Sequence, residues 1–341
     1  LDTRFTPSRR LPHAIVQPGI DQGSWRLVYE QIRGVVCLSE VSTPVGGVER
    51  IDYDDAGHRF PGDAYAALPR VTRHTVVPGR NQPDMVTTYD YTSNNFLGFG
   101  SGISWRDDGE DNLYKSTDSR FSYGSTAFYL SGGQPLRSIT RTFNRFHLLT
   151  LQRTEQAHDV FDEGSDQPRR ETCIQETKTT YHELPNLNFA QQPAYFQLPR
   201  VQSQSWSIRE DLARRREQVV ITLYDEHGNL TLESQAAPPV YQGETLDEAR
   251  TLAGAMRTQY SYYPREGEGD DCPPDPEAFV RHRKSATQLP AETSEGQAAP
   301  LRTRYRYRHL PALSTAPQSN GLLIAHEEDV LQVQGEHEQL L

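Results

Sequence analysis

The sequence predicts an all-β protein built from repeated antiparallel β-hairpins, with short helices confined to loops. Three observations lead to this prediction. The 341 residues include 23 Pro and 24 Gly, which interrupt helices and mark turns. Several segments alternate β-branched or aromatic residues with polar ones, as strands with two different faces do. Aromatic residues also recur at regular intervals along the chain.

The strand and turn signals can be placed along the chain. Segments with the composition of strands are residues 24–29, 75–77, 217–224 and 302–307. In the last of these, Arg and Tyr alternate, which would place one residue type on each face of the sheet. Residues 54–57 and 225–229 are rich in turn formers, because Asp and Asn make local hydrogen bonds and Gly accepts positive φ. We therefore predict a hairpin tip at each of these two positions.

Aromatic landmarks define an internal repeat. There are seven of them: Tyr53, Tyr91, Phe143, Tyr181, Tyr224, Tyr262 and Tyr305. The successive spacings are 38, 52, 38, 43, 38 and 43 residues, so that a shorter step alternates with a longer one. Residues 67–71, 197–201 and 279–281 each contain an apolar residue, with or without Pro, followed by Arg at the entry into a predicted strand. The Arg lies 17 to 19 residues after a landmark in each case. A recurring step of this kind is the sequence signature of a repeat architecture.

Charge and cysteine content exclude several classes of function. The 35 basic and 46 acidic residues give a formal net charge of -11, whereas binding to nucleic-acid phosphates requires a basic face. No segment reaches the roughly 20 apolar residues of a membrane-spanning helix. The three cysteines, Cys37, Cys173 and Cys272, form no C-x-x-C pair, and indicate neither a disulfide framework nor a zinc site. We therefore predict no nucleic-acid partner, no membrane span and no cofactor.

The chain is expected to form one continuous architecture. Residues 1–35 would lead into or pack on the repeat region, which would span residues 36–341. The first residues show no Met and no cationic-then-apolar signal peptide, and we expect the chain to be a fragment of a longer polypeptide. Residues 245–256 are the best helix candidate, because a Thr at the start is followed by acidic residues. This helix would decorate a loop between repeats.

Two segments resemble the tyrosine-aspartate signature of Rhs proteins, also called YD-repeat proteins. They contain Tyr224, Asp225 and Gly228 in one case and Tyr53, Asp54 and Gly57 in the other. Residues 42–50, 94–100 and 142–148 also resemble Rhs polypeptides related to the B and C components of insecticidal Tc toxin complexes. The resemblance covers the chain from about residue 36 to its end.

The resemblance implies a long β-sheet ribbon that spirals into a hollow shell around a toxic C-terminal segment. Each hairpin would add to the previous sheet edge, and the landmark tyrosines would be architectural, with their hydroxyl groups exposed to water. The partners would be other segments of the shell, the enclosed effector and a delivery or translocation component. The protein would be secreted or delivered from a bacterium. Because the self-cleaving Asp-Pro-x-Gly core of the family is not found here, we expect no enzyme activity.

An acidic segment is the best candidate for a cation site. Asp107, Asp108, Glu110 and Asp111 could bind Ca²⁺, which takes several carboxylate oxygens from a flexible loop. The segment lacks the twelve-residue pattern of an EF-hand, and a solvated acidic turn is the alternative interpretation. Weaker acidic loops stand at residues 159–166 and 266–271.

Two other classes of function stay open. A carbohydrate or cell-surface binding module could stack Trp25, Trp105 and Trp206 on sugars, although packing within the sheet is the alternative. A hydrolase could form its site between distant loops. The sequence has no H-E-x-x-H and no G-x-S-x-G, the patterns that would mark a metalloprotease or a serine hydrolase. We therefore assign no catalytic residue.

Overall fold

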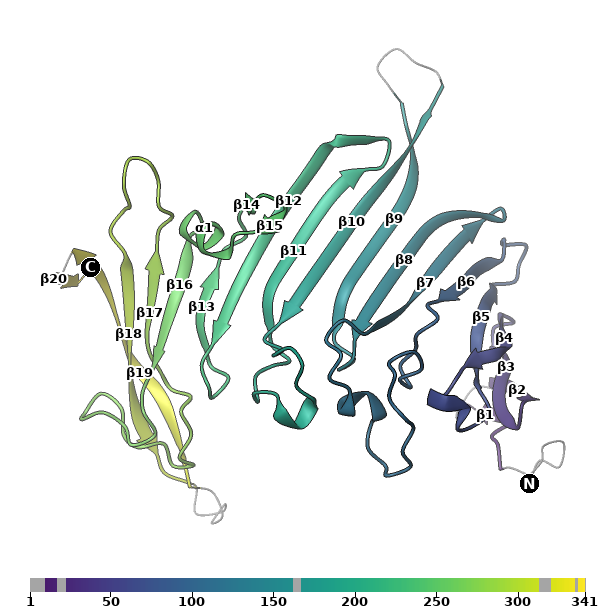
Figure 1. Cartoon of the computed structure of the whole chain (residues 1–341), viewed down its shortest axis with the longest axis horizontal. Helices are drawn as coiled ribbons and strands as arrows, with labels where there is room; N and C mark the ends of the chain where they lie inside the picture. Colours follow the sequence, from purple (N-terminus) through teal and green to yellow (C-terminus); the bar gives the residue numbers. More distant parts are fainter. Residues whose placement is uncertain (1–9, 17–22, 162–166, 313–319, 335–336, 341) are drawn as a thin grey trace. The chain divides into compact units, whose positions relative to one another are not determined.

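The chain is almost entirely β in a computed structural model, which describes residues 10–16, 23–161, 167–312, 320–334 and 337–340. Eighteen strands belong to one antiparallel sheet, and two more form a small separate hairpin (Figure 1). The described residues contain one short α-helix, α1 (Glu248–Ala253). The prediction of an all-β fold with short loop helices is thus confirmed. None of the described helices is long and apolar enough to cross a membrane.

The chain divides into two compact units, of which the first comprises Leu1–Thr177, Leu184–Gln192 and Ser205–Arg216. The strands wholly within it are β1 (Ala14–Val16), β2 (Ser24–Ile32), β3 (Val35–Ser42), β4 (Val48–His58), β5 (Leu68–Val77), β6 (Met85–Tyr91), β7 (Ser122–Ser131), β8 (Gln134–Asn144) and β9 (Leu149–Val160). Each pairs antiparallel with the next strand in sequence. The predicted leading segment, as far as it is described, contributes β1 and β2 to this meander.

The second unit comprises Lys178–Glu183, Pro193–Gln204 and Glu217–Leu341. Its own sheet strands are β13 (Leu230–Ser234), β16 (Arg257–Tyr262), β17 (Arg283–Leu289), β18 (Leu301–Leu310), β19 (Leu322–Gln334) and β20 (His337–Leu340), again paired in sequence order. The separate hairpin consists of β14 (Tyr241–Gln242) and β15 (Thr245–Leu246). Three long strands are shared between the two units: β10 (Arg169–Tyr181), β11 (Pro199–Ile208) and β12 (Asp211–Tyr224).

The aromatic landmarks lie on alternate strands. In chain order they belong to β4, β6, β8, β10, β12, β16 and β18. In the first unit, β4, β6 and β8 run in one direction, because each is antiparallel to the strand between them. The same holds for β16 and β18 in the second unit. Each step of the sequence repeat therefore corresponds to one pair of strands.

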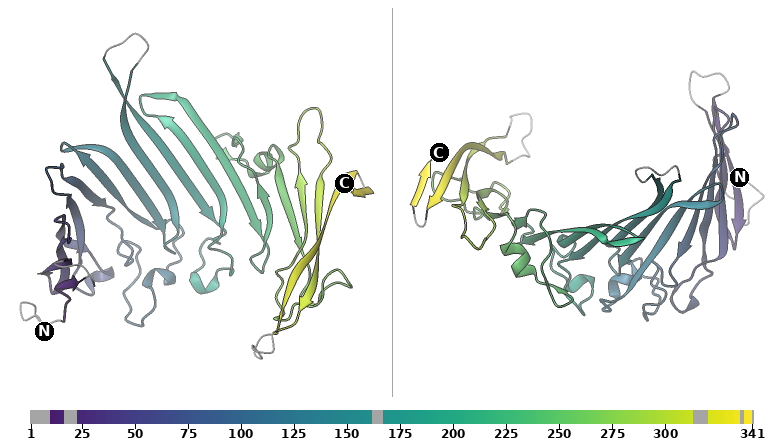
Figure 2. Two further views of the ribbon diagram at one scale, coloured as in Figure 1. Left: turned by 180° about the vertical axis from the view of Figure 1, so that it is seen from behind. Right: turned by 90° about the horizontal axis from the view of Figure 1, so that it is seen from above.

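The sheet leaves most of its surface in contact with solvent. The chain exposes 21479 Å², whereas a compact globular chain of this length exposes about 14,000 Å². Within each unit the strands form a single layer (Figure 2), and most strand side chains are at least partly exposed. Buried apolar residues form small local clusters, such as Val201, Val219 and Ile221 beneath Leu246 and Leu252. Burial of apolar surface therefore contributes less here than in a protein with a central core.

The predicted helix is shorter than expected. Helix α1 covers only Glu248–Ala253, because Thr245 and Leu246 belong to β15 and pair with β14. Asp247 caps the helix in place of Thr245, since its carboxylate accepts a hydrogen bond from the Arg250 N–H at 3.1 Å. A carboxylate at this position satisfies one of the otherwise unpaired N–H groups at the start of a helix.

One of the two predicted hairpin tips is correct and the other is wrong. Residues 225–229 form the tight turn between β12 and β13. Residues 54–57 instead lie inside β4, where the pairing with β5 moves from Asp54–Arg70 to His58–Leu68. Three residues of β4 therefore lie opposite the single residue Pro69 of β5. This mismatch is a β-bulge. Proline suits this position because it has no N–H to offer to a regular ladder.

We expect Gly57→Ala to destabilise the chain strongly. Gly57 has a φ of +57°, and a Cβ there would lie 2.1 Å from the carbonyl oxygen of Leu68. Gly34→Ala is the matched control, because Gly34 also has positive φ but nothing lies within 4 Å of its Cβ position. Chemical denaturation should show a loss of about 1 kcal/mol for the control and about 3 kcal/mol or more for Gly57→Ala. Equal losses would contradict the bulge.

Candidate functional site

Three landmark tyrosines fasten their strands to the preceding strand of the sheet. Their hydroxyl groups donate to main-chain carbonyl oxygens: Tyr53 to Leu38 (2.8 Å), Tyr91 to Val71 (2.8 Å) and Tyr262 to Leu230 (2.9 Å). The acceptors lie on β3, β5 and β13, each of which pairs with the strand of its tyrosine. Burial raises the pKa of all three phenols, which keeps them protonated as donors. Each of these hydroxyl groups, which we expected to be exposed to water, thus has a main-chain partner.

Two other landmarks, Phe143 and Tyr224, pack through their rings. Phe143 stacks on Tyr123 of β7, with ring centroids 5.4 Å apart. The ring of Tyr224 meets His182 edge-on at 5.5 Å, and burial raises the pKa of Tyr181. Because Phe143 has no hydroxyl group, the bond to a carbonyl oxygen is a feature of some landmarks and not of all.

Asp or Asn side chains close three five-residue loops in the same way. In each loop the side-chain Oδ1 accepts hydrogen bonds from the N–H groups two and four residues later: Asp225 from His227 and Asn229, Asn144 from Phe146 and Leu148, and Asp275 from Glu277 and Phe279. Such bonds satisfy turn N–H groups that have no ladder partner. Asn144 follows the landmark Phe143 as Asp225 follows Tyr224, so the sequence contained a signal that the turn search missed. Asp275 follows no aromatic residue and carried no such signal.

The other aspartate of the signature has a different role. Asp54 accepts from the Ala56 N–H at 2.7 Å inside the bulge and pairs with Arg70 of β5 at 2.9 Å. The hydrogen bond from Ala56, together with Arg70, lowers the pKa of Asp54. Asp54 therefore joins β4 to β5 across the bulge instead of closing a hairpin tip.

Asp275 is a buried ionic anchor ahead of β17. Its side chain is 1% exposed and accepts from Arg281 Nε at 2.9 Å and from His282 Nε2 at 2.7 Å. Burial alone would raise the pKa of this carboxyl, but the hydrogen bonds from Glu277, Phe279, Arg281 and His282 outweigh it and lower the pKa. The ionised carboxylate thus fixes the segment that was predicted to start a strand at Arg281.

The acidic residues of the predicted cation site are paired with other protein groups. Asp108 contacts Lys115 Nζ at 2.5 Å, Asp107 accepts from the Tyr65 hydroxyl, and Asp111 contacts His147 Nε2 at 2.7 Å. The Glu110 N–H donates to Asp108. Among the residues that the structure describes, no three metal-ligating side chains converge anywhere. The structure therefore does not bring the four carboxylates together; residues 162–166 of the second acidic loop lie outside the described residues.

His147 joins the acidic loop to β7. Its Nε2 faces Asp111 at 2.7 Å and its Nδ1 faces the hydroxyl group of Tyr123 at 2.6 Å. Burial raises the pKa of Tyr123 to about 12. These two hydrogen bonds form an Asp–His–Tyr chain that ties the acidic loop to β7.

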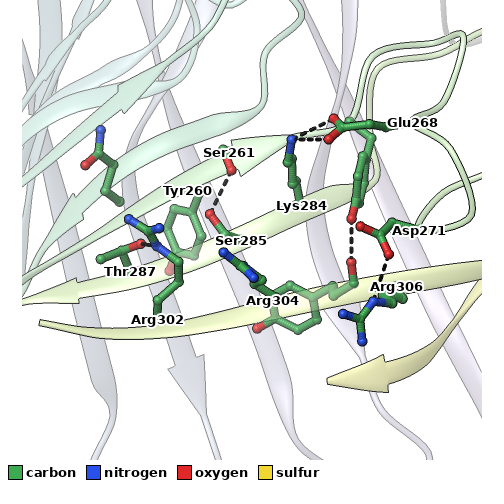
Figure 3. A pocket seen from close by; sticks show the side chains of 13 residues that line it. Tyr260, Ser261, Glu268, Asp271, Lys284, Ser285, Thr287, Arg302, Arg304 and Arg306 are labelled. Carbon is green, nitrogen blue, oxygen red and sulfur yellow. Dashed lines mark hydrogen bonds and ion pairs between the residues drawn. The ribbon is translucent and has the colours of Figure 1, made fainter. Parts of the chain in front are cut away.

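A polar pocket with a volume of about 550 Å³ lies over β16, β17 and β18 (Figure 3). The strand register places Ser261 opposite Ser285 and then Arg304, and it places Thr287 opposite Arg302. The two serine hydroxyl groups share a hydrogen bond of 2.8 Å, and Arg302 Nε donates to Thr287 Oγ1 at 3.1 Å. Neighbouring strands thus present one continuous polar row to the pocket.

Carboxylates balance the cationic side chains of this pocket. The pairs are Lys284 with Glu268, Arg306 with Asp271, Glu327 and Asp329, and both Arg302 and Arg304 with Glu338. Glu268 and Asp271 come from the third acidic loop. The landmark Tyr305 also lines the pocket, and its carbonyl oxygen accepts from the buried Tyr263 hydroxyl at 2.9 Å. The arrangement is suited to recognition by hydrogen bonds and charge.

The tryptophans do not form a common surface. Trp105 packs edge-on against Phe60 with ring centroids 4.8 Å apart, and Trp206 lies beneath the guanidinium group of Arg216. Trp25, on β2, is 38% exposed. Trp105 and Trp206 thus contact other side chains, as the alternative of packing within the protein predicts.

Comparison with known proteins gives distant similarity to solved structures. No protein-family model and no curated protein sequence matches the chain. The crystal structure of TcdB2-TccC3-Cdc42 contains a similar chain, with 11% identity over 94% of this chain and a TM-score of 0.21. The matched region is 16% of that longer chain. At this identity and TM-score the similarity carries no argument about function.

We expect Tyr91→Phe to cost about 1 kcal/mol of unfolding free energy, because the carbonyl oxygen of Val71 loses a buried donor. Tyr89→Phe is the matched control on the same strand, since the Tyr89 hydroxyl group makes no hydrogen bond to another of the described residues. Urea denaturation of the two variants beside the wild type measures the difference. A loss that is as large for Tyr89→Phe would contradict the assigned role of the Tyr91 hydroxyl.

Alkaline pH should unfold the region around Tyr263. This side chain is 3% exposed, and burial raises its pKa to about 12, above the ordinary value of about 10. Its stabilising contribution is therefore complete below pH of about 10 and is lost as the pH rises toward 12. We expect the stability difference between wild type and Tyr263→Phe to shift in favour of the variant over this interval, as measured by urea denaturation at each pH. A difference that is independent of pH would contradict the assignment.

Proposed function

We propose that the chain is a structural wall segment of a bacterial toxin of the Rhs or Tc type, in a shell that encloses an effector polypeptide until delivery. The observation that carries this proposal is the single-layer antiparallel sheet, in which a strand pair repeats and most strand side chains are at least partly exposed. The sequence phrases that resemble Rhs proteins support the same conclusion.

A wall between two aqueous spaces needs two wet faces. Sheets of ordinary domains bury at least one face against another layer, whereas this chain exposes 21479 Å² of surface. The row of Ser261, Ser285 and Arg304 in the second unit is an example of a polar stretch of the sheet. Such a stretch offers an enclosed polypeptide little apolar surface on which to fold.

The landmark residues fit a wall that is extended by repetition. Each tyrosine that binds a carbonyl oxygen, such as Tyr53 or Tyr91, acts only between neighbouring strands. Stability then depends on contacts between adjacent units, as in other repeat architectures. In this proposal the partners are other shell segments, the effector and a delivery component, and the protein is secreted; the chain itself has no catalytic role.

Electron microscopy of the natural polypeptide that contains these 341 residues tests the proposal. We expect a hollow particle whose wall includes this sheet, with additional density in the lumen. The matched control is the same polypeptide without its effector segment, which should keep the wall and lose the internal density. A compact particle without a lumen would overturn the proposal.

A further inference from the structure

Two arginines of β18 share one carboxylate from β20. Arg302 Nη1 donates to Glu338 Oε1 at 2.5 Å, and Arg304 Nη2 donates to Oε2. The Glu338 side chain is 20% exposed, less than either arginine. Hydrogen bonds between two charged groups are about twice as strong as those between neutral groups. We call the paired guanidinium groups of Arg302 and Arg304 the arginine fork.

The arginine fork is built by strands other than β20. Arg302 and Arg304 are two residues apart on β18, so their side chains share one face of the sheet. Thr287 of β17 accepts a hydrogen bond from Arg302 Nε at 3.1 Å, which orients that guanidinium group. The pocket of about 550 Å³ lies beside the fork and offers hydroxyl groups from Ser261 and Ser285. Arg302 therefore has a hydrogen-bond partner outside β20.

Strand β20 is held by few contacts other than the fork. It forms four residue pairs with β19, between residues 331–334 and 337–340. Leu340 is 64% exposed, so the strand gains little from apolar burial. On the same edge of β19, residues 322–330 have no partner strand among the described residues. An unpaired strand edge is a template for another extended chain.

We propose that the arginine fork is a binding site for an acidic side chain of an extended peptide segment, which adds to the edge of β19 as a strand. Glu338 fills this site from within the chain. Main-chain bonds to β19 would hold the segment, and the fork would select a carboxylate at one position, which is the usual division of labour in strand addition. A segment longer than β20 would also pair with residues 322–330. The proposal does not depend on encapsulation.

The tethered β20 competes with any free segment. A tethered group has an effective concentration in the millimolar range, so a free peptide binds the wild-type chain weakly. Glu338→Gln removes the negative charge from the fork while it keeps the size of the side chain. This variant should therefore expose the site to a peptide in solution.

Fluorescence anisotropy with two labelled peptides tests the site on the full chain. The first, GQHEQLL, copies residues 335–341 with Gln in place of Glu336; the second, GQHQQLL, lacks the remaining carboxylate as well. We expect GQHEQLL to bind the Glu338→Gln chain at least about tenfold more tightly than it binds the wild-type chain. We also expect the Glu338→Gln chain to bind GQHEQLL at least about tenfold more tightly than it binds GQHQQLL. Adding Arg302→Gln should abolish this preference. Arg308→Gln, the matched control on the same strand, should leave it unchanged.

Three results would overturn the proposal. The first is equal binding of both peptides to the Glu338→Gln chain. The second is that the chain with Arg302→Gln added still prefers GQHEQLL to GQHQQLL. The third is complete displacement of the peptide by inorganic phosphate at equal concentration. The last result would mark a general anion site instead of a strand site. Thermal melting checks that the variants fold. If Glu338→Gln does not fold, Glu338→Asp provides the second variant, because its shorter side chain weakens the contact with the fork and should increase peptide binding in the same direction.

Discussion

Hydrogen bonding between adjacent strands is the constraint on which the rest of this structure depends. In a single layer with two wet faces, no strand gains enough from apolar burial to stay in place by itself. The tyrosine hydroxyl groups extend the ladder, since Tyr91 uses its side chain to reach a carbonyl oxygen of the strand before it. The Asp and Asn loops serve the same need where the ladder ends, because Asp225 supplies acceptors to N–H groups of the turn.

Ion pairs across strands also help to specify the register in which the strands pair. Asp54 with Arg70 joins β4 to β5, and Glu338 joins β18 to β20. Exposed pairs of this kind contribute little to stability one by one. They do penalise a shift of register, because a slip by one residue moves every charged side chain to the opposite face. In a long sheet of similar strands, this discrimination matters more than the energy of any single pair.

Local patterns explain how much of the fold could be predicted. Alternation and aromatic spacing depend on a strand's own residues, and the turn at Asp225 uses bonds within five residues. The bulge at Gly57 could not be distinguished from a hairpin tip, because both structures accept the same residue types. The bulge forms because residues 55–57 lie opposite the single residue Pro69 of the partner strand. The site was harder to predict. Arg302 and Glu338 are 36 residues apart in sequence, and no local pattern joins them.

The loop between β6 and β7 shows how a repeat can vary in length without losing its pairing. The step from Tyr91 to Phe143 is 52 residues, whereas the other two long steps are 43, yet β6 and β7 still pair without interruption from Val86–Leu130 to Tyr91–Ser125. The additional residues fall in the connection, residues 92–121. The length of this connection can therefore differ from that of the other long steps while the strands on either side keep their neighbours. Its sequence is more constrained than its length, because Leu113 is fully buried and the carbonyl oxygen of Ser116 accepts from the buried Arg145.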